Sequence, residues 1–199
     1  MTTHAYLGLI IPAEGKQLGN DWYRKFVASS TAYGYQNSDR GPTVDIDGRS
    51  NGIDAGMGRT WSLEKGSVDL SATVGYRDVK LTPYAPANDR AGNLFTFNPQ
   101  LMLSRQLSSR VDTDLIANYS TGTSSSFVRA RIGMRPSESY RIGIEGKWLD
   151  GRNYRVKKQG LFVALKVSEK LILELNGGRE EPDDRNNTTY VGIALSTSF

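Results

Sequence analysis

The end of the chain alternates strictly between apolar and small polar side chains. One register holds Val191, Ile193, Leu195, Thr197 and Phe199, and the other holds Tyr190, Gly192, Ala194, Ser196 and Ser198. Because residues two apart lie on the same face of a strand, residues 189–199 predict a strand with one oily face and one small, polar face. A solvated outer surface would carry charges on the second face. Gly, Ala and Ser opposite Val, Ile and Leu are typical of a transmembrane barrel strand.

The same alternation predicts ten further strands. They are expected over 5–12, 22–36, from after 42 to about 63, and then around 68–77, 95–103, 111–120, 128–135, 142–148, 161–167 and 171–176. The clearest case sets Val68, Leu70, Ala72, Val74 and Tyr76 against Asp69, Ser71, Thr73, Gly75 and Arg77. The predicted fold is therefore an all-β, transmembrane, antiparallel up-and-down β-barrel that forms one domain over residues 1–199.

The segments between these strands alternate between tight turns and longer polar loops from the second strand onward. Tight turns are expected at 64–66, 108–110, 136–139 and 168–170, and loops at 37–42, 82–93, 121–126, 150–159 and 177–188. Short periplasmic turns and long extracellular loops are typical of outer-membrane barrels. Eleven strands are visible, whereas bacterial barrels have an even number. We therefore expect about twelve strands, the first of them missing from the N-terminal end. Merging two segments into one, for a count of ten, is the alternative.

Composition restricts the classes of protein that fit. The 25 basic and 21 acidic residues give a net charge of +4, too mild and dispersed to indicate a nucleic-acid partner. There is no cysteine, which excludes disulfides and thiolate metal sites. No apolar run approaches the roughly 18 to 20 residues of a membrane helix. Residues 1–4 show no signal-peptide pattern, so an exported protein would be represented here by its mature or trimmed sequence.

The sequence offers little that could carry catalysis. His4 is the only histidine, and we expect it to be a disordered or surface residue near the N-terminus. Barrel hydrolases need a histidine base near neutral pKa beside Ser or Asp, so a lipid-modifying barrel enzyme is disfavoured. No phosphate loop, HExxH motif or calcium loop is present. Asp183 and Asp184 could contact a cation, but a solvated loop is the better interpretation. We expect no enzyme activity, no cofactor and no bound metal.

Charged residues on the small, polar face are the more informative set. The candidate lumen network consists of Asp112, Asp114, Arg129, Arg131, Arg135, Glu145, Lys147 and Glu174. We expect Asp112 and Asp114 to face Arg129, Arg131 and Arg135 on the adjoining strand. Because buried charges must be paired, a structural ion-pair network that fills a narrow interior is the preferred interpretation. A polar channel or a polymer-binding wall is the functional alternative.

A second group comprises aromatic residues at strand ends, namely Trp22, Tyr76, Trp148 and Phe199. Aromatic girdles at both lipid–water interfaces are a regular feature of transmembrane barrels. A platform for stacking sugars is the alternative, and the girdle is the better default.

Several short segments resemble the cellulose biosynthesis protein BcsS family of Gram-negative bacteria, and the similarity spans nearly the whole chain. The segments are Ala5-Tyr6-Leu7-Gly8, Ala32-Tyr33-Gly34-Tyr35, Val74-Gly75-Tyr76-Arg77-Asp78, Leu81-Thr82-Pro83, Asn88-Asp89-Arg90-Ala91-Gly92 and Asn118-Tyr119-Ser120-Thr121. The combined segment from Gly75 to Pro83 is the most specific of them. The sequence departs from the family at Ile10-Ile11-Pro12-Ala13, where an apolar run ending in Asn-Gly is more usual.

The resemblance implies an accessory outer-membrane protein of cellulose or exopolysaccharide production and biofilm formation. Family members have an additional strand before the segment at Ala5, which agrees with the missing twelfth strand. The implied partners are outer-membrane lipid or lipopolysaccharide, cellulose or another glucan, and components of cellulose secretion. The family has no established active site to carry over. A narrow channel and a barrel that docks glucan or partners both remain open, with a plugged structural or adhesion barrel as the alternative.

Overall fold

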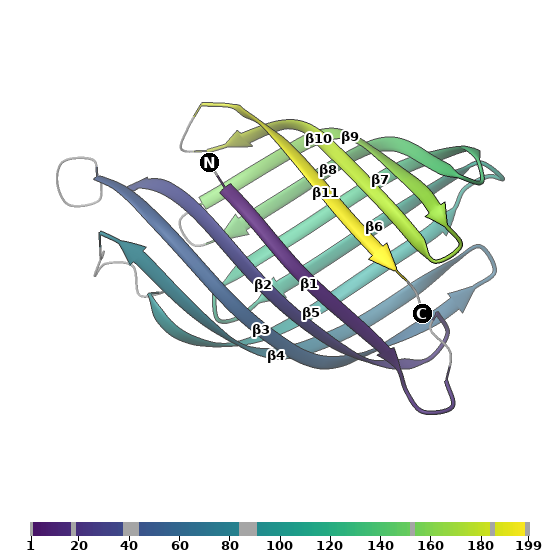
Figure 1. Ribbon diagram of the computed structural model, residues 1–199, viewed down its shortest axis with the longest axis horizontal. Coiled ribbons are helices and arrows are strands. Elements are labelled where there is room, and N and C mark those ends of the chain that lie inside the picture. The colour runs from purple at the N-terminus through teal and green to yellow at the C-terminus, as the bar shows by residue number, and fades with distance from the viewer. Residues whose placement is uncertain are drawn as a thin grey trace. The chain divides into compact units, whose positions relative to one another are not determined.

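The computed structural model describes residues 2–16, 19–37, 44–83, 91–151, 154–183 and 186–197. Most of the predicted loops at 37–42 and 82–93 lies outside these ranges, as do Asp184 and Phe199. The described residues form eleven strands, shown in Figure 1: β1 (Thr2–Pro12), β2 (Trp22–Asn37), β3 (Val44–Leu63), β4 (Gly66–Thr82), β5 (Gly92–Gln106), β6 (Val111–Ser120), β7 (Ser125–Ser137), β8 (Tyr140–Gly151), β9 (Tyr154–Ser168), β10 (Leu171–Pro182) and β11 (Thr188–Thr197).

These strands belong to one sheet whose order is the order of the chain, β1 to β11. Neighbouring strands whose registers are defined, such as β1 and β2 or β9 and β10, are antiparallel. The predicted all-β, antiparallel, up-and-down fold class is therefore confirmed. Within the described ranges, no helix is long and apolar enough to cross a membrane.

Two predicted loops are wrong in part. The segment 177–188 was expected to be a loop, but β10 continues to Pro182, with Gly177 paired to Leu161 and Glu180 to Lys158. The polar segment 150–159 was expected to form a tip, but β8 continues to Gly151 and β9 begins at Tyr154, with Asp150 paired to Arg155 and Gly146 to Gln159. Polar residues can continue a β-ladder because the backbone supplies its hydrogen bonds, so polarity alone did not mark the strand end. The strict alternation of tight turns and long loops consequently fails between β8 and β9.

Contacts divide the chain into two compact units. Unit 1 comprises Met1–Thr60, Leu70–Pro99 and Ser120–Ser124, and unit 2 comprises Trp61–Asp69, Gln100–Tyr119 and Ser125–Phe199.

In unit 1, the polar face of the strands is buried and the apolar face is exposed. On β4, Ser71 and Thr73 are buried, whereas Leu70, Val74 and Tyr76 are exposed. On β5, Thr96 is buried while its neighbour Phe95 is 83% exposed. This arrangement is the reverse of a soluble protein, in which large apolar side chains gather in the interior.

Unit 2 shows the same inversion. Arg131 and Glu145 are each 3% exposed, while their strand neighbours Ile132 and Ile144 are exposed. On β11, Val191 is 84% exposed. In each unit, we call the buried polar side the shielded face and the apolar side the exposed face. A continuous apolar surface of this kind requires an apolar environment, and lipid provides one.

Candidate functional site

A buried arginine holds two glutamates on the shielded face of unit 2. Nε and one terminal nitrogen of Arg131 donate to Oε2 of Glu145 at 2.9 and 2.7 Å. Its terminal nitrogens also donate to Oε2 and Oε1 of Glu174 at 2.7 and 2.6 Å. Such multiply bonded, charge-assisted contacts are the strongest polar contacts available to an arginine. We call these three residues the charge brace.

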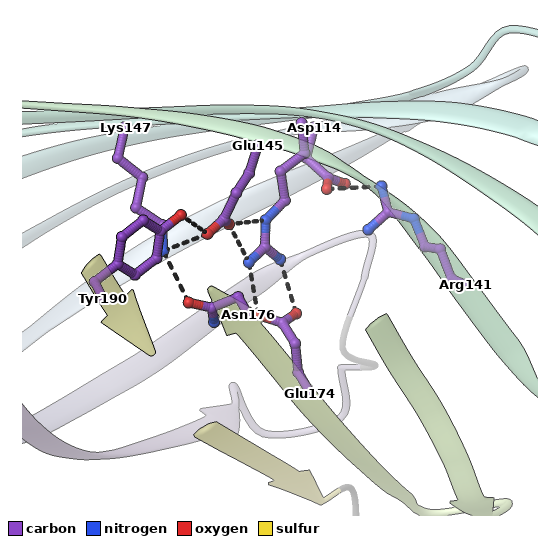
Figure 2. A network of polar contacts seen from close by, with 8 residues as sticks. Asp114, Arg141, Glu145, Lys147, Glu174, Asn176 and Tyr190 are labelled. Carbon is purple, nitrogen blue, oxygen red and sulfur yellow. Dashed lines mark hydrogen bonds and ion pairs between the residues drawn. The ribbon is translucent and has the colours of Figure 1, made fainter. Parts of the chain in front are cut away.

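The second oxygen of Glu145 extends the charge brace toward β11. Glu145 Oε1 lies 2.6 Å from Nζ of Lys147 and accepts a hydrogen bond from the Tyr190 hydroxyl at 2.8 Å. Lys147 also donates to Oδ1 of Asn176 at 3.2 Å. Figure 2 shows Glu145 and Lys147 pointing toward Tyr190 and Asn176. Both oxygens of the buried carboxylate are therefore satisfied.

A second cluster centres on Arg141 of β8. Its terminal nitrogen contacts Asp112 and lies 2.9 Å from Oδ2 of Asp114. Asp112 is also 2.9 Å from Arg135. The ring of Phe162, the most deeply buried large side chain, lies 4.5 Å from the Arg131 guanidinium carbon and 4.8 Å from that of Arg141. Phe162 therefore links the two clusters through cation–π contacts.

Curvature of unit 2 toward its shielded face favours these contacts. Neighbouring strands lie about 4.8 Å apart, so β7 and β10, separated by β8 and β9, would be about 14 Å apart in a flat sheet. Arg131 on β7 nevertheless bonds Glu174 on β10 at 2.6 Å. Side chains that stand perpendicular to a flat sheet would not meet over this distance, so a sheet that curls as barrel strands do favours the contact.

Glycines provide the space in which the large polar side chains lie. Gly160 and Gly178 separate Glu145 from Tyr190 along one cross-strand row. A Cβ at Gly160 would be 2.5 Å from the Tyr190 hydroxyl oxygen and 2.3 Å from the carbonyl oxygen of Gly177. Tyr190 can therefore reach across β9 and β10 to Glu145 because Gly160 lacks a side chain.

Unit 1 has a separate, smaller network around Asp54 of β3. Oδ1 of this buried carboxylate accepts hydrogen bonds from Asn98 at 2.7 Å and Thr96 at 3.3 Å. Its Oδ2 lies 3.4 Å from Arg77. Asp54 therefore holds β3, β4 and β5 together through side chains on the shielded face.

The structure places the predicted network residues on one face but changes their partners. Arg135 pairs with Asp112, as expected. Arg131 does not pair with Asp112 or Asp114. Its guanidinium instead forms an ion pair with Glu145, which lies directly opposite it on β8. Asp114 pairs with Arg141 instead. The prediction considered β6 as the partner strand of β7 and overlooked the strand on the other side.

Sequence reasoning missed Arg141, Phe162, Asn176, Tyr190 and the Asp54 cluster as site residues. A signal was present, because Arg141 shares the register of Glu145 and Lys147, and Tyr190 shares that of Gly192. Phe162 gave a weaker signal, because alternation with Leu161 and Val163 places it on the polar face, but an apolar side chain does not indicate a polar network.

The three predicted interface aromatics within the described ranges lie on the exposed face. Trp22, Tyr76 and Trp148 are 45%, 39% and 47% exposed. Arg59 lies 5.6 Å from the Trp22 ring, and Lys157 lies 5.5 Å from the Trp148 ring. Aromatic rings beside long cations are typical of the lipid headgroup region. Their role in a girdle stays a prediction, and Phe199 lies outside the described residues.

Two ionisable residues lie apart from these networks. His4 is an exposed residue within β1 and contacts the Thr31 hydroxyl at 2.6 Å, so it is a surface residue rather than part of a disordered end. Between β1 and β2, a hydrogen bond from Lys16 and another from the backbone N–H of Trp22 lower the pKa of the Asp21 carboxyl.

Comparison with known proteins identifies the family. Among solved structures, the chain is similar to two described as "KdgM porin in complex with disordered oligogalacturonate" and "KdgM porin"; for each, the identity is 10%, the TM-score is 0.49, and the match covers 100% of this chain and 99% of that chain. No curated protein matches the sequence. The family model described as cellulose biosynthesis protein BcsS matches residues 2–199, the residues that carry the eleven strands and both networks. The chain therefore belongs to the cellulose biosynthesis protein BcsS family.

Proposed function

We propose that this protein is a non-enzymatic outer-membrane β-barrel that serves cellulose production as a narrow channel for small polar solutes. Family membership supports the link to cellulose biosynthesis. The inverted faces support insertion in a membrane, because the exposed face carries large apolar side chains such as Phe95, Ile144 and Val191. An outer membrane is the bacterial membrane in which strands, rather than helices, span the lipid.

The main support for a channel is that charged side chains around the buried Arg131 and Glu145 are partly exposed. Arg131 and Glu145 are buried. The side chains of Asp114, Glu174 and Arg135, in contrast, are 25%, 19% and 55% exposed. Water therefore reaches charged groups of both signs beside the charge brace. A polar wall that water wets along its length is what a narrow aqueous path needs.

Single-channel conductance of the folded protein in a planar bilayer tests this function. We expect a small, steady current. Block of that current by cello-oligosaccharides would further support passage of glucan fragments. A correctly folded barrel that carries no current would overturn the channel.

The charge brace itself favours a second candidate, a structural barrel with a plugged interior. Arg131 joins strands separated by two others, so its side chain crosses the shielded face instead of lining one strand. In this case the charged residues stabilise the fold, and the connections between strands perform the function.

A double variant separates the two candidates. R131A/E174A removes one charge of each sign and leaves Glu145 paired with Lys147. A channel should conduct more current after this change, because two side chains that meet across the shielded face are removed. The control D112A/R135A also removes one charge of each sign and leaves Arg141 paired with Asp114. A plugged barrel should lose stability with R131A/E174A and stay silent.

A further inference from the structure

Three basic residues form a cross-strand row on the shielded face of unit 2. Arg129 of β7 lies directly opposite Lys147 of β8, and Lys147 lies directly opposite Lys158 of β9. We call Arg129, Lys147 and Lys158 the basic row. Like charges directly opposite each other in antiparallel strands are destabilising unless counter-charges separate them. The row therefore needs negative charge nearby.

Two of the three cations already have carboxylate partners. Lys147 is 2.6 Å from Glu145, and Lys158 is 2.6 Å from Glu180. Both ammonium groups also lie over the Tyr190 ring, at 4.8 and 5.4 Å from its centre. These contacts fix the position of each lysine, since a charge held by a carboxylate and a ring has little freedom to move.

Arg129 is the cation without such a partner. Among the residues that the structure describes, no carboxylate lies within ion-pair distance of it, and its buried Nε has no hydrogen-bond partner. The nearby carboxylates of Glu145 and Glu174 are engaged by Lys147 and by Arg131. An arginine that is partly buried and has no carboxylate partner is suited to a bidentate oxyanion.

The position of the row excludes lipid headgroups as the source of that anion. Trp148 and Lys157, the chain neighbours of Lys147 and Lys158, lie on the opposite, exposed face. Lipid headgroups would meet those residues, whereas the basic row faces the polar side. We propose that the basic row, with Arg129 as its main donor, is a binding site for a soluble oxyanion, either a carboxylate or a phosphate group of a small solute.

This inference rests on the proposed function in one respect, which is that the shielded face is accessible to water. It names the class of solute that the channel would favour. The row lies near the start of β7 and the end of β8. An anion that enters from this end of the two strands would meet Arg129 before it reaches the charge brace.

Titration calorimetry on the folded protein in nonionic detergent tests the site. The probes are inorganic phosphate, glucuronate and uncharged glucose. We expect phosphate, glucuronate or both to bind and glucose not to bind. Loss of one charge-assisted contact weakens binding by about tenfold or more, so R129Q should show that loss. Binding of only one probe would identify which oxyanion the row accepts.

Arg135 provides a matched control. It lies on the same strand and face as Arg129, and R135Q removes the same charge. We expect R135Q to change the affinity by no more than about twofold, because a partly exposed, distant charge acts weakly. Equal weakening by R129Q and R135Q would indicate general charge attraction and would overturn the site. Absence of binding to the wild-type protein would also overturn it. Calorimetry measures anion binding and does not depend on conductance. If the folded protein carried no current in a bilayer, the channel would be contradicted, while the anion site would still be tested by calorimetry.

Discussion

At the scale of single residues, Arg131 should contribute most to stability. It is buried, and it holds Glu145 and Glu174. We expect R131Q to lower the free energy of unfolding by about 3–5 kcal/mol, because removing one partner leaves buried charge without compensation. Urea unfolding from lipid vesicles, followed by circular dichroism, measures this loss.

An exposed ion pair gives the comparison. Lys166 lies 2.7 Å from Glu169 beside the turn between β9 and β10. K166Q should cost about 0–1 kcal/mol, since solvent screens such pairs. If R131Q and K166Q had the same small effect, the charge brace would not be a stabilising centre.

The charged residues of the shielded face could be predicted, but their partners could not. Alternation alone assigns Asp114, Arg131 and Glu145 to one face. The choice of partner depends on the strands on both sides and on sheet curvature, which brings Glu174 to Arg131 across two strands. Sequence spacing contains neither piece of information.

At the scale of strands, glycine spacing determines how closely the large side chains lie on the sheet. Gly160 is covered by Tyr190, whereas a Cβ at Gly146 would meet no atom within 4 Å. We expect G160A to cost about 1–3 kcal/mol, because the added Cβ would meet both the Gly177 carbonyl oxygen and the Tyr190 hydroxyl, so that Tyr190 must move away from Glu145. Thermal unfolding of the folded protein in detergent measures the difference.

Gly146 is the matched control, since it lies in the neighbouring strand and has open space around it. G146A should be neutral or slightly stabilising, as alanine restricts the unfolded chain. Equal destabilisation by both substitutions would show that the close approach of Tyr190 is not important.

Strand boundaries were predictable wherever polar turns interrupted the alternation. β2 begins at Trp22 and β6 covers 111–120, as predicted. The exceptions at 150–159 and 177–182 arose because polar residues such as Asp150, Arg155 and Glu180 are still paired in the ladder. Hydrophobicity reports the apolar part of a strand, while backbone pairing can continue beyond it.

At the scale of the whole molecule, insertion in a membrane depends on which face of the sheet meets lipid. The sequence predicted the inversion from β11, where Val191 and Ile193 alternate with Gly192 and Ala194, and the exposure of those residues follows that pattern. The twelfth strand and the aromatic girdle stay predictions.

Spin-label accessibility along β4 is the most direct test of this claim. The chain contains no cysteine, so single cysteines at each position from Leu70 to Tyr76 can be labelled without background and reconstituted in vesicles. We predict that labels at 70, 74 and 76 collide mainly with lipid-soluble oxygen, because those side chains are exposed and apolar. Labels at Ser71 and Thr73 should show little such contact. Uniform accessibility to a water-soluble reagent, or the reverse alternation, would contradict a membrane barrel with a polar interior.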